Sequence, residues 1–144
     1  MAQLYLVGID GSEPSNHAVA YAAEQAASVG AALLLAHVID WSGYDFMGPE
    51  ELAERHKKRE AEIAAAEEKI MSPAKALAAK YGVEAETMVR HGQATEVLLG
   101  LIAERDVSQV FVGRNGQSRF EALIFGSTTN ALAQHSPVPV TVMP

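Results

Sequence analysis

Glycines and hydroxyl side chains in a regular spacing mark one segment of the sequence as able to hold an anion. Gly113 and Gly116 are separated by two residues, and nine more residues lead to Gly126 and Ser127, with Thr128 next. Glycine lets a backbone approach an anion with no Cβ in the way, and the free N–H groups at the start of a helix favour a phosphate. The pattern predicts a phosphate cradle, in which the Ser127 hydroxyl donates to a phosphate oxygen. Turn glycines followed by a serine that only caps a helix would give the same pattern.

Short apolar segments alternate with longer segments of helical spacing, and this order predicts the elements that position the cradle. The expected strands are Leu4–Ile9, Ala32–Ile39, Val83–Val89, Val107–Val112 and Val138–Met143. The first expected helix is capped by Ser12 and closed by Gly30. The second runs from Glu50 to Tyr81 and is kinked or broken at Pro73. The third and fourth run from Thr95 to Arg105 and from Ser127 to His135. Alternating strands and helices indicate an α/β fold, with an open five-stranded parallel sheet between two helical layers.

Apolar residues at helical spacing predict which helix faces are buried. The first helix has a stripe of small residues: Val19, Ala22, Ala23 and Ala26. The second expected helix has the larger anchors Leu52, Ile63, Ile70 and Leu77. The third has Val97, Leu98, Leu101 and Ile102.

Ligands of an open α/β sheet bind beyond the carboxyl ends of its strands, where the strand order reverses. Residues with useful chemistry follow the expected strands: Asp10 after the first, Asp40 after the second, and Arg90 and His91 after the third. The cradle from Gly113 follows the fourth strand. We therefore expect these residues to share one edge of the sheet.

Four segments in register resemble the ATP-binding class of the universal stress protein family. They are LVGIDGS (6–12), LAHVID (35–40), VFVG (110–113) with the G-x2-G-x9-GS spacing that continues from it, and HSPVPV (135–140). The resemblance covers nearly the whole chain and is weakest from Trp41 to Tyr81. It implies a single domain over residues 1–144, with the adenine nucleotide alpha hydrolase-like fold.

The resemblance also implies a role for each site residue. Asp10 would hydrogen-bond the ribose or help to hold Mg²⁺, Val38 would bring backbone groups to the adenine edge, and Ile9 would form an apolar wall. Gly113 would approach the ribose, and Gly116, Gly126, Ser127 and Thr128 would hold the phosphates. Where family members usually carry a small residue and another glycine, this chain has Gln117-Ser118-Arg119. The full predicted nucleotide-binding set is Ile9, Asp10, Val38, Gly113, Arg114, Gly116, Gln117, Gly126, Ser127 and Thr128.

Composition excludes several other functions. The chain has no cysteine, which rules out thiol nucleophiles and thiolate zinc sites. Its net charge of −7 disfavours bulk attraction to nucleic acid or anionic lipid. No P-loop lysine motif and no general base with a supporting partner is evident. The five histidines lack zinc spacing, although His91 at a strand end merits attention.

The N-terminus lacks a signal-peptide pattern and no apolar run reaches the ~20 residues of a membrane span, so we expect a cytoplasmic protein.

These features favour a sensor that binds ATP, with Mg²⁺, and regulates a partner protein such as a transporter or enzyme in a stress response. Two rivals stay open: a slow ATPase or phosphotransferase, and a protein-interaction module without nucleotide.

The apolar segment Val138–Met143 contains Pro139, as an edge strand would, and predicts a homodimer or higher oligomer formed through that edge. The aromatic loop Trp41–Pro49 would be a lid, a contact with a partner subunit, or a cap on the local core.

Overall fold

The computed structural model of the chain describes residues 3–40, 49–114 and 126–144. Within these ranges five strands form one parallel sheet in the order β3-β2-β1-β4-β5. The strands are β1 (Leu4–Gly8), β2 (Ala32–Asp40), β3 (Glu86–Gly92), β4 (Gln109–Gly113) and β5 (Val140–Met143). After β1, the chain adds β2 and then β3 on one side of β1. It then adds β4 and β5 on the other side of β1. The order therefore reverses between β1 and β4, which is where a ligand site is expected.

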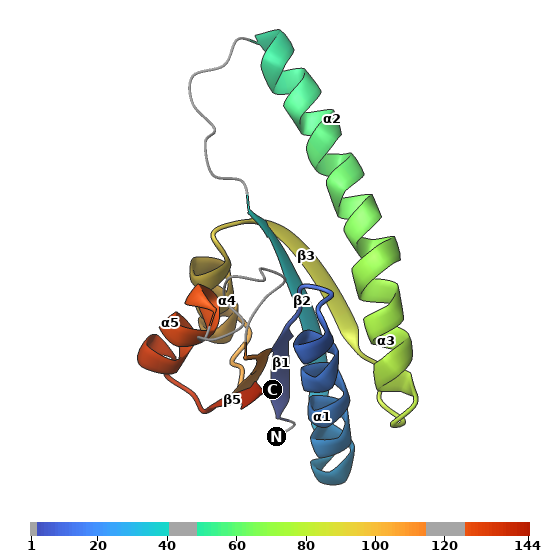
Figure 1. The fold of residues 1–144 in the computed structure, drawn as a ribbon, viewed down its shortest axis with the longest axis vertical. Coiled ribbons are helices and arrows are strands. Elements are labelled where there is room, and N and C mark those ends of the chain that lie inside the picture. Colours follow the sequence, from blue (N-terminus) through green and yellow to red (C-terminus); the bar gives the residue numbers. More distant parts are fainter. Residues whose placement is uncertain (1–2, 41–48, 115–125) are drawn as a thin grey trace.

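Helices cover both faces of the sheet, as Figure 1 shows. On one face lie α1 (Glu13–Val29) and α3 (Ser72–Ala79), and on the other lie α4 (Ala94–Glu104) and α5 (Ser127–His135). Side chains of a strand alternate between faces, so Val7 and Leu35 pack beneath α1, whereas Leu6 and Leu34 pack beneath α4 and α5. The central strands are apolar on both faces because both are covered.

The first helix follows its sequence signals. The Ser12 hydroxyl oxygen accepts a hydrogen bond from the Ser15 N–H at 3.3 Å, and Gly30 ends the helix in the left-handed conformation at φ 73°. The small-residue stripe of α1 is fully buried, at Val19, Ala22, Ala23 and Ala26. Small side chains bring the helix axis close to the sheet, which matters for the position of its first turn in the site.

The long helix expected from Glu50 to Tyr81 is divided. The structure has α2 (Pro49–Ala66), a π-helical turn η1 (Glu67–Met71) and then α3, whose first turn contains Pro73. A proline lacks the N–H that an uninterrupted helix needs and crowds the preceding turn, so the widened turn lies immediately before it. The expected interruption is confirmed.

Leu52 was expected to anchor this helix, and that expectation is wrong. Its side chain is 55% exposed, because the first turns of α2 stand clear of the sheet and of the other helices (Figure 1). Ile63, Ile70 and Leu77, further along, are half-buried. Helical spacing predicts which side of a helix is apolar, but it does not reveal how far the sheet extends beneath it.

The third strand begins later than expected, at Glu86 instead of Val83. Val83 is buried, but its N–H donates to the Ala78 carbonyl oxygen at 3.3 Å, so it still belongs to the turn that ends α3. Arg90 and His91 consequently lie inside β3, and only Gly92 stands at its end.

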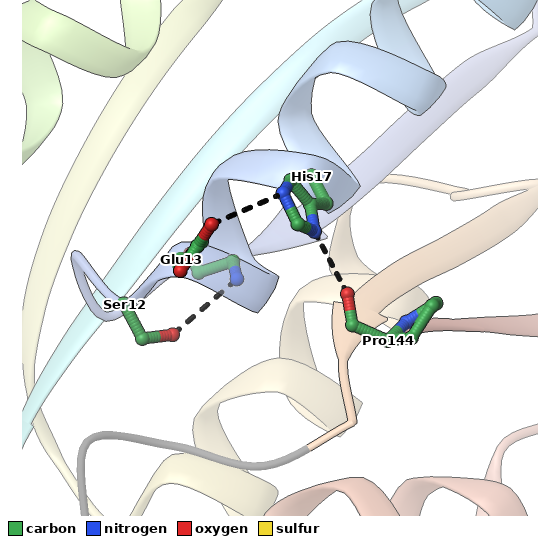
Figure 2. A network of polar contacts seen from close by, with 5 residues as sticks. Ser12, Glu13, His17 and Pro144 are labelled. Atoms are coloured by element: carbon green, nitrogen blue, oxygen red, sulfur yellow. Dashed lines mark hydrogen bonds and ion pairs between the residues drawn. The ribbon is translucent and has the colours of Figure 1, made fainter.

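The last strand is tied to the first helix. The carbonyl oxygen of Pro144 accepts a hydrogen bond from Nδ1 of His17 at 2.8 Å, and Nε2 of the same ring lies 3.8 Å from Glu13 Oε1 (Figure 2). An N–H must sit on Nδ1 because the acceptor is a carbonyl oxygen. Among the described residues, no helix is long and apolar enough to cross a membrane.

Candidate nucleotide-binding site

A cavity of about 150 Å³ lies at the carboxyl edge of the sheet, between the ends of β1 and β4. The register places Gly8 of β1 opposite both Ala36 of β2 and Val112 of β4, so β1 and β4 end at nearly the same level, whereas β2 continues past them to Asp40. The walls come from these strand ends and from the starts of α1, α4 and α5: Gly8, Ile9, Asp10, Ser15, Ala36, Val38, Ala94, Leu98, Val112, Gly113, Gly126, Ser127, Thr128 and Thr129. The cavity therefore occupies the point at which the strand order reverses.

One wall is the turn that joins β1 to α1. The Ser12 N–H donates to Asp10 Oδ1 at 2.9 Å, and the Asp10 N–H donates to the Ser15 hydroxyl oxygen at 3.1 Å. Ser15 is 2% exposed, so its hydroxyl is a fixed part of the wall. These bonds hold the Asp10 carboxylate at the cavity in a defined orientation, where it can accept from a hydroxyl or ligate a cation.

A second wall is the start of α5. Gly126 precedes the helix, and its backbone (φ −58°, ψ 152°) aims the first turn at the cavity. The first N–H groups of a helix have no partner within it, so those of Ser127 and Thr128 are suited to an anion. Thr129 fixes this turn, since its hydroxyl donates to the Gly113 carbonyl oxygen at 2.7 Å.

Gly113 is required for packing whatever the cavity binds. A Cβ at this position would lie 2.8 Å from the Cβ of Pro14 and 2.9 Å from the backbone nitrogen of Ser15. The first turn of α1 therefore rests directly on the end of β4. The family resemblance implied that Gly113 approaches a ribose, which stays a prediction; the structure shows that Pro14 and Ser15 occupy the space that a Cβ would need.

The third wall is apolar. It is formed by Ala36 and Val38 of β2, Ala94 and Leu98 of α4, and Val112 of β4. Such a surface suits a flat ring system, whereas the Asp10 and Ser127 sides suit sugar and phosphate groups. Apolar and polar walls thus meet in one cavity.

Most of the predicted residues that the structure describes line this cavity: Ile9, Asp10, Val38, Gly113, Gly126, Ser127 and Thr128. Arg114 does not line it. Its side chain is exposed, and its N–H donates to the Met143 carbonyl oxygen at 2.6 Å, which extends the pairing of β4 with β5. Gly116, Gln117 and Arg119 lie outside the described residues, as does the loop from Trp41 to Gly48. Nucleotide binding by any of these residues stays a prediction.

Sequence reasoning missed Ser15, Thr129 and the α4 residues Ala94 and Leu98. Ser15 is three residues after a capping serine, and its type alone does not distinguish a wall residue from a surface one. Ala94 opens a helix that the pattern starts at Thr95. The residues after Gly126-Ser127 carry a signal that could have been used, since Thr129 lies in the first turn of the same helix.

The three remaining candidate residues at strand ends do not line the cavity. Arg90 donates from its guanidinium to Glu104 Oε2 at 3.2 Å. Asp40 is exposed at the end of β2. The His91 side chain is 2% exposed and its Nε2 lies 3.1 Å from Glu62 Oε2, so it joins β3 to α2. In the described part of the chain, no group of three or more histidines and carboxylates could hold a metal ion.

The comparisons with known proteins agree with this arrangement. A family model described as the universal stress protein family matches residues 1–144. The chain belongs to this family. It is 30% identical to the universal stress protein YxiE of Bacillus subtilis over 96% of each chain.

Solved structures of universal stress proteins share the fold. UspA from Lactobacillus plantarum matches with a TM-score of 0.84 and 22% identity, over 99% of this chain and 97% of that one. A universal stress protein in complex with cAMP matches with a TM-score of 0.71 and 26% identity, over 99% and 96%. The expected three-layer α/β fold of the adenine nucleotide alpha hydrolase-like type is confirmed.

Proposed function

We propose that this universal stress protein binds an adenine nucleotide in the cavity between β1 and β4, and that the bound nucleotide regulates its contact with a partner. The observation that carries the proposal is the division of the cavity into an apolar wall, from Val38 to Leu98, and a polar wall at the start of α5. A purine would lie against the first wall and phosphates against the second. Support also comes from the 26% identical universal stress protein whose structure contains cAMP.

The preferred nucleotide in this proposal is ATP with Mg²⁺. Magnesium is usually held by one or two carboxylates together with the phosphates of its nucleotide. The Asp10 carboxylate, which lines the same cavity as the start of α5, fits that requirement without a cluster of protein ligands. When bound, the ion would neutralise phosphate charge.

The proposal makes the protein a sensor in the cytoplasm and not an enzyme. Among the described residues that line the cavity, Asp10 is the one carboxylic acid, and none is a histidine, lysine or arginine. The Asp10 carboxylate oxygen already accepts the Ser12 N–H, which suits binding and orientation better than proton abstraction. A slow ATPase, with Asp10 orienting a water or the metal, is the rival that uses the same site.

A homodimer through β5 is part of the proposal. This strand is the last in the sheet order, and within residues 3–40, 49–114 and 126–144 no other strand pairs with its outer edge along Val140–Met143. It is also connected to the site, because Arg114 continues from β4 and pairs with Met143. Nucleotide binding at the end of β4 would thereby reach the dimer edge.

Mass spectrometry of nucleotide released from the purified protein tests the main proposal. Retained ATP supports the sensor, and ADP together with steady phosphate release supports the rival enzyme. Calorimetry that detects no binding at millimolar ATP would favour an interaction module instead.

A pair of variants in the same helix locates the site. Gly126→Val introduces a branched side chain at the cavity wall, in a backbone conformation that any residue can adopt, and should abolish ATP binding. Ala133→Val changes an exposed position of α5 by a similar volume and should leave binding intact. Normal ATP binding by a folded Gly126→Val protein would show that the nucleotide is held elsewhere.

A further inference from the structure

The hydrogen-bond ladder between β1 and β2 ends in an unusual way. It begins with the Ala32 N–H donating to the Gln3 carbonyl oxygen at 2.8 Å, and it continues to the Ile9 N–H donating to the Ala36 carbonyl oxygen at 2.8 Å. In a parallel ladder the next bond would join the Val38 N–H to the Ile9 carbonyl oxygen. Among the backbone hydrogen bonds of the described residues, that bond is not made.

A side chain takes its place. Nδ1 of His37 lies 2.7 Å from the Ile9 carbonyl oxygen. Since a carbonyl oxygen only accepts, Nδ1 carries the hydrogen and the imidazole is the donor. The carbonyl that would have continued the ladder is therefore satisfied by His37, at the point where the chain turns away towards Asp10.

The consequence falls on Val38. Alternate residues of β2 direct their backbone groups to β1, and Ala36 is one of them, so Val38 is the next. Its N–H and carbonyl groups are therefore directed past the end of β1, and Val38 is a wall residue of the cavity. A strand amide that is not exposed needs a partner, and the cavity is the place from which a ligand can supply one.

We infer that His37 is a positioning residue for recognition of the base: by occupying the Ile9 carbonyl oxygen it keeps the Val38 backbone available to the edge of an adenine ring. This inference rests on the proposed nucleotide function. Adenine presents an amino donor beside a ring-nitrogen acceptor, which matches the carbonyl oxygen and N–H of Val38. Hypoxanthine presents an oxygen acceptor beside an N–H donor, the reverse pattern, and would leave both Val38 groups unpaired.

The same bond would also have a simpler use, as an anchor for the turn that carries Asp10. The two roles predict different results when the donor is removed. An anchor affects all nucleotides equally, because the Asp10 turn does not contact the base. A positioning role affects adenine more than hypoxanthine, because the freed Ile9 oxygen can then bond the Val38 N–H and close the ladder.

Two substitutions at one position separate these roles. His37→Asn keeps an N–H donor on the atom bonded to Cγ, where Nδ1 of histidine is, and His37→Leu keeps a similar branched shape without a donor. Calorimetry with ATP and ITP should show that the wild type prefers ATP. His37→Leu should lower ATP affinity and the ATP-to-ITP preference each by about tenfold, whereas His37→Asn should keep the preference within about threefold of the wild type.

Amide hydrogen exchange provides the second measurement, without nucleotide. The Val38 N–H should exchange much faster than the Ala36 N–H in the wild type and in His37→Asn, and it should become protected in His37→Leu. An unchanged ATP-to-ITP preference in folded His37→Leu, or a Val38 amide as protected as Ala36 in the nucleotide-free wild type, would overturn the inference. Failure of the wild type to bind either nucleotide would instead overturn the proposed function, and the exchange rates would still decide the role of His37.

Discussion

The Thr129 hydroxyl donates to the Gly113 carbonyl oxygen across 2.7 Å, and both residues are buried. This bond joins the first turn of α5 to the end of β4, beside the Gly126 N–H, which donates to the Arg114 carbonyl oxygen at 3.1 Å. Together they fix the polar wall of the cavity to the sheet. The orientation of the α5 N–H groups towards the cavity therefore depends on a side chain that faces away from solvent.

Replacing Thr129 by valine should destabilise the protein. Valine has nearly the same shape, but it leaves the buried Gly113 carbonyl without its donor, at a cost of about 1–3 kcal/mol in the free energy of unfolding. Urea denaturation measures this loss. Thr129→Ser, which keeps the hydroxyl, should recover the larger part of it, and equal losses in both variants would mean that the methyl group matters and the hydrogen bond does not.

Gly113→Ala should also destabilise the fold, through a clash. The added Cβ would lie 2.8 Å from the Pro14 Cβ and 2.9 Å from the Pro14 carbonyl carbon, and a backbone atom cannot rotate away. We expect a loss of about 1–3 kcal/mol, as in other overpacked sites. Gly100→Ala is the matched control: it lies in α4 with open space around it, and alanine should stabilise the helix by about 0.5–1 kcal/mol. Thermal unfolding of the two variants should shift in opposite directions.

The sequence was sufficient for the elements whose burial is set by local pattern. Val7 and Leu35 sit in strands that are apolar on both faces, and the Ser12 and Gly30 caps follow from residue type alone. The site was predictable as an edge of the sheet, because parallel strands end together and Asp10 and Gly126 follow two of them.

What the sequence could not show depends on distances between elements. The exposure of Leu52 results from the length of α2 relative to the sheet, which no periodicity encodes. Two contacts join segments that lie far apart in the chain. Gly113 packs against Pro14, and the His37 ring, instead of the Val38 N–H, bonds the Ile9 carbonyl oxygen. A histidine in a strand gives no sign that its ring replaces a backbone donor.

Leu52→Lys should leave stability unchanged, within about 0.5 kcal/mol, because the side chain is already largely in solvent. Leu101→Ala, in a fully buried position of α4, should cost about 2–5 kcal/mol. Urea denaturation of both variants checks the contrast. A large loss in Leu52→Lys would show that α2 packs against something in solution, such as a second subunit.

Glu86→Gln should remove a contribution to stability that depends on pH. Arg105 donates to both carboxylate oxygens of Glu86, at 2.8 and 2.9 Å. These hydrogen bonds are the largest cause of a lowered Glu86 pKa; burial opposes them, and the guanidinium charge adds to them. A lowered pKa in the folded state stabilises the protein above the unfolded value of about 4.3, and the stabilisation is lost as the pH falls through the folded value.

The two proteins should therefore differ in melting temperature at neutral pH, by at most a few degrees because both side chains are partly exposed. The difference should diminish as the pH falls through the lowered pKa of folded Glu86, because below that pH the carboxyl group is protonated in both states. Added salt should also reduce it at neutral pH, since exposed charges are screened. Glu84→Gln, at a neighbouring exposed position, controls for the general loss of one negative charge. A difference between wild type and Glu86→Gln that grew as the pH fell would contradict the assignment, because the ion pair can stabilise the fold only while Glu86 is ionised.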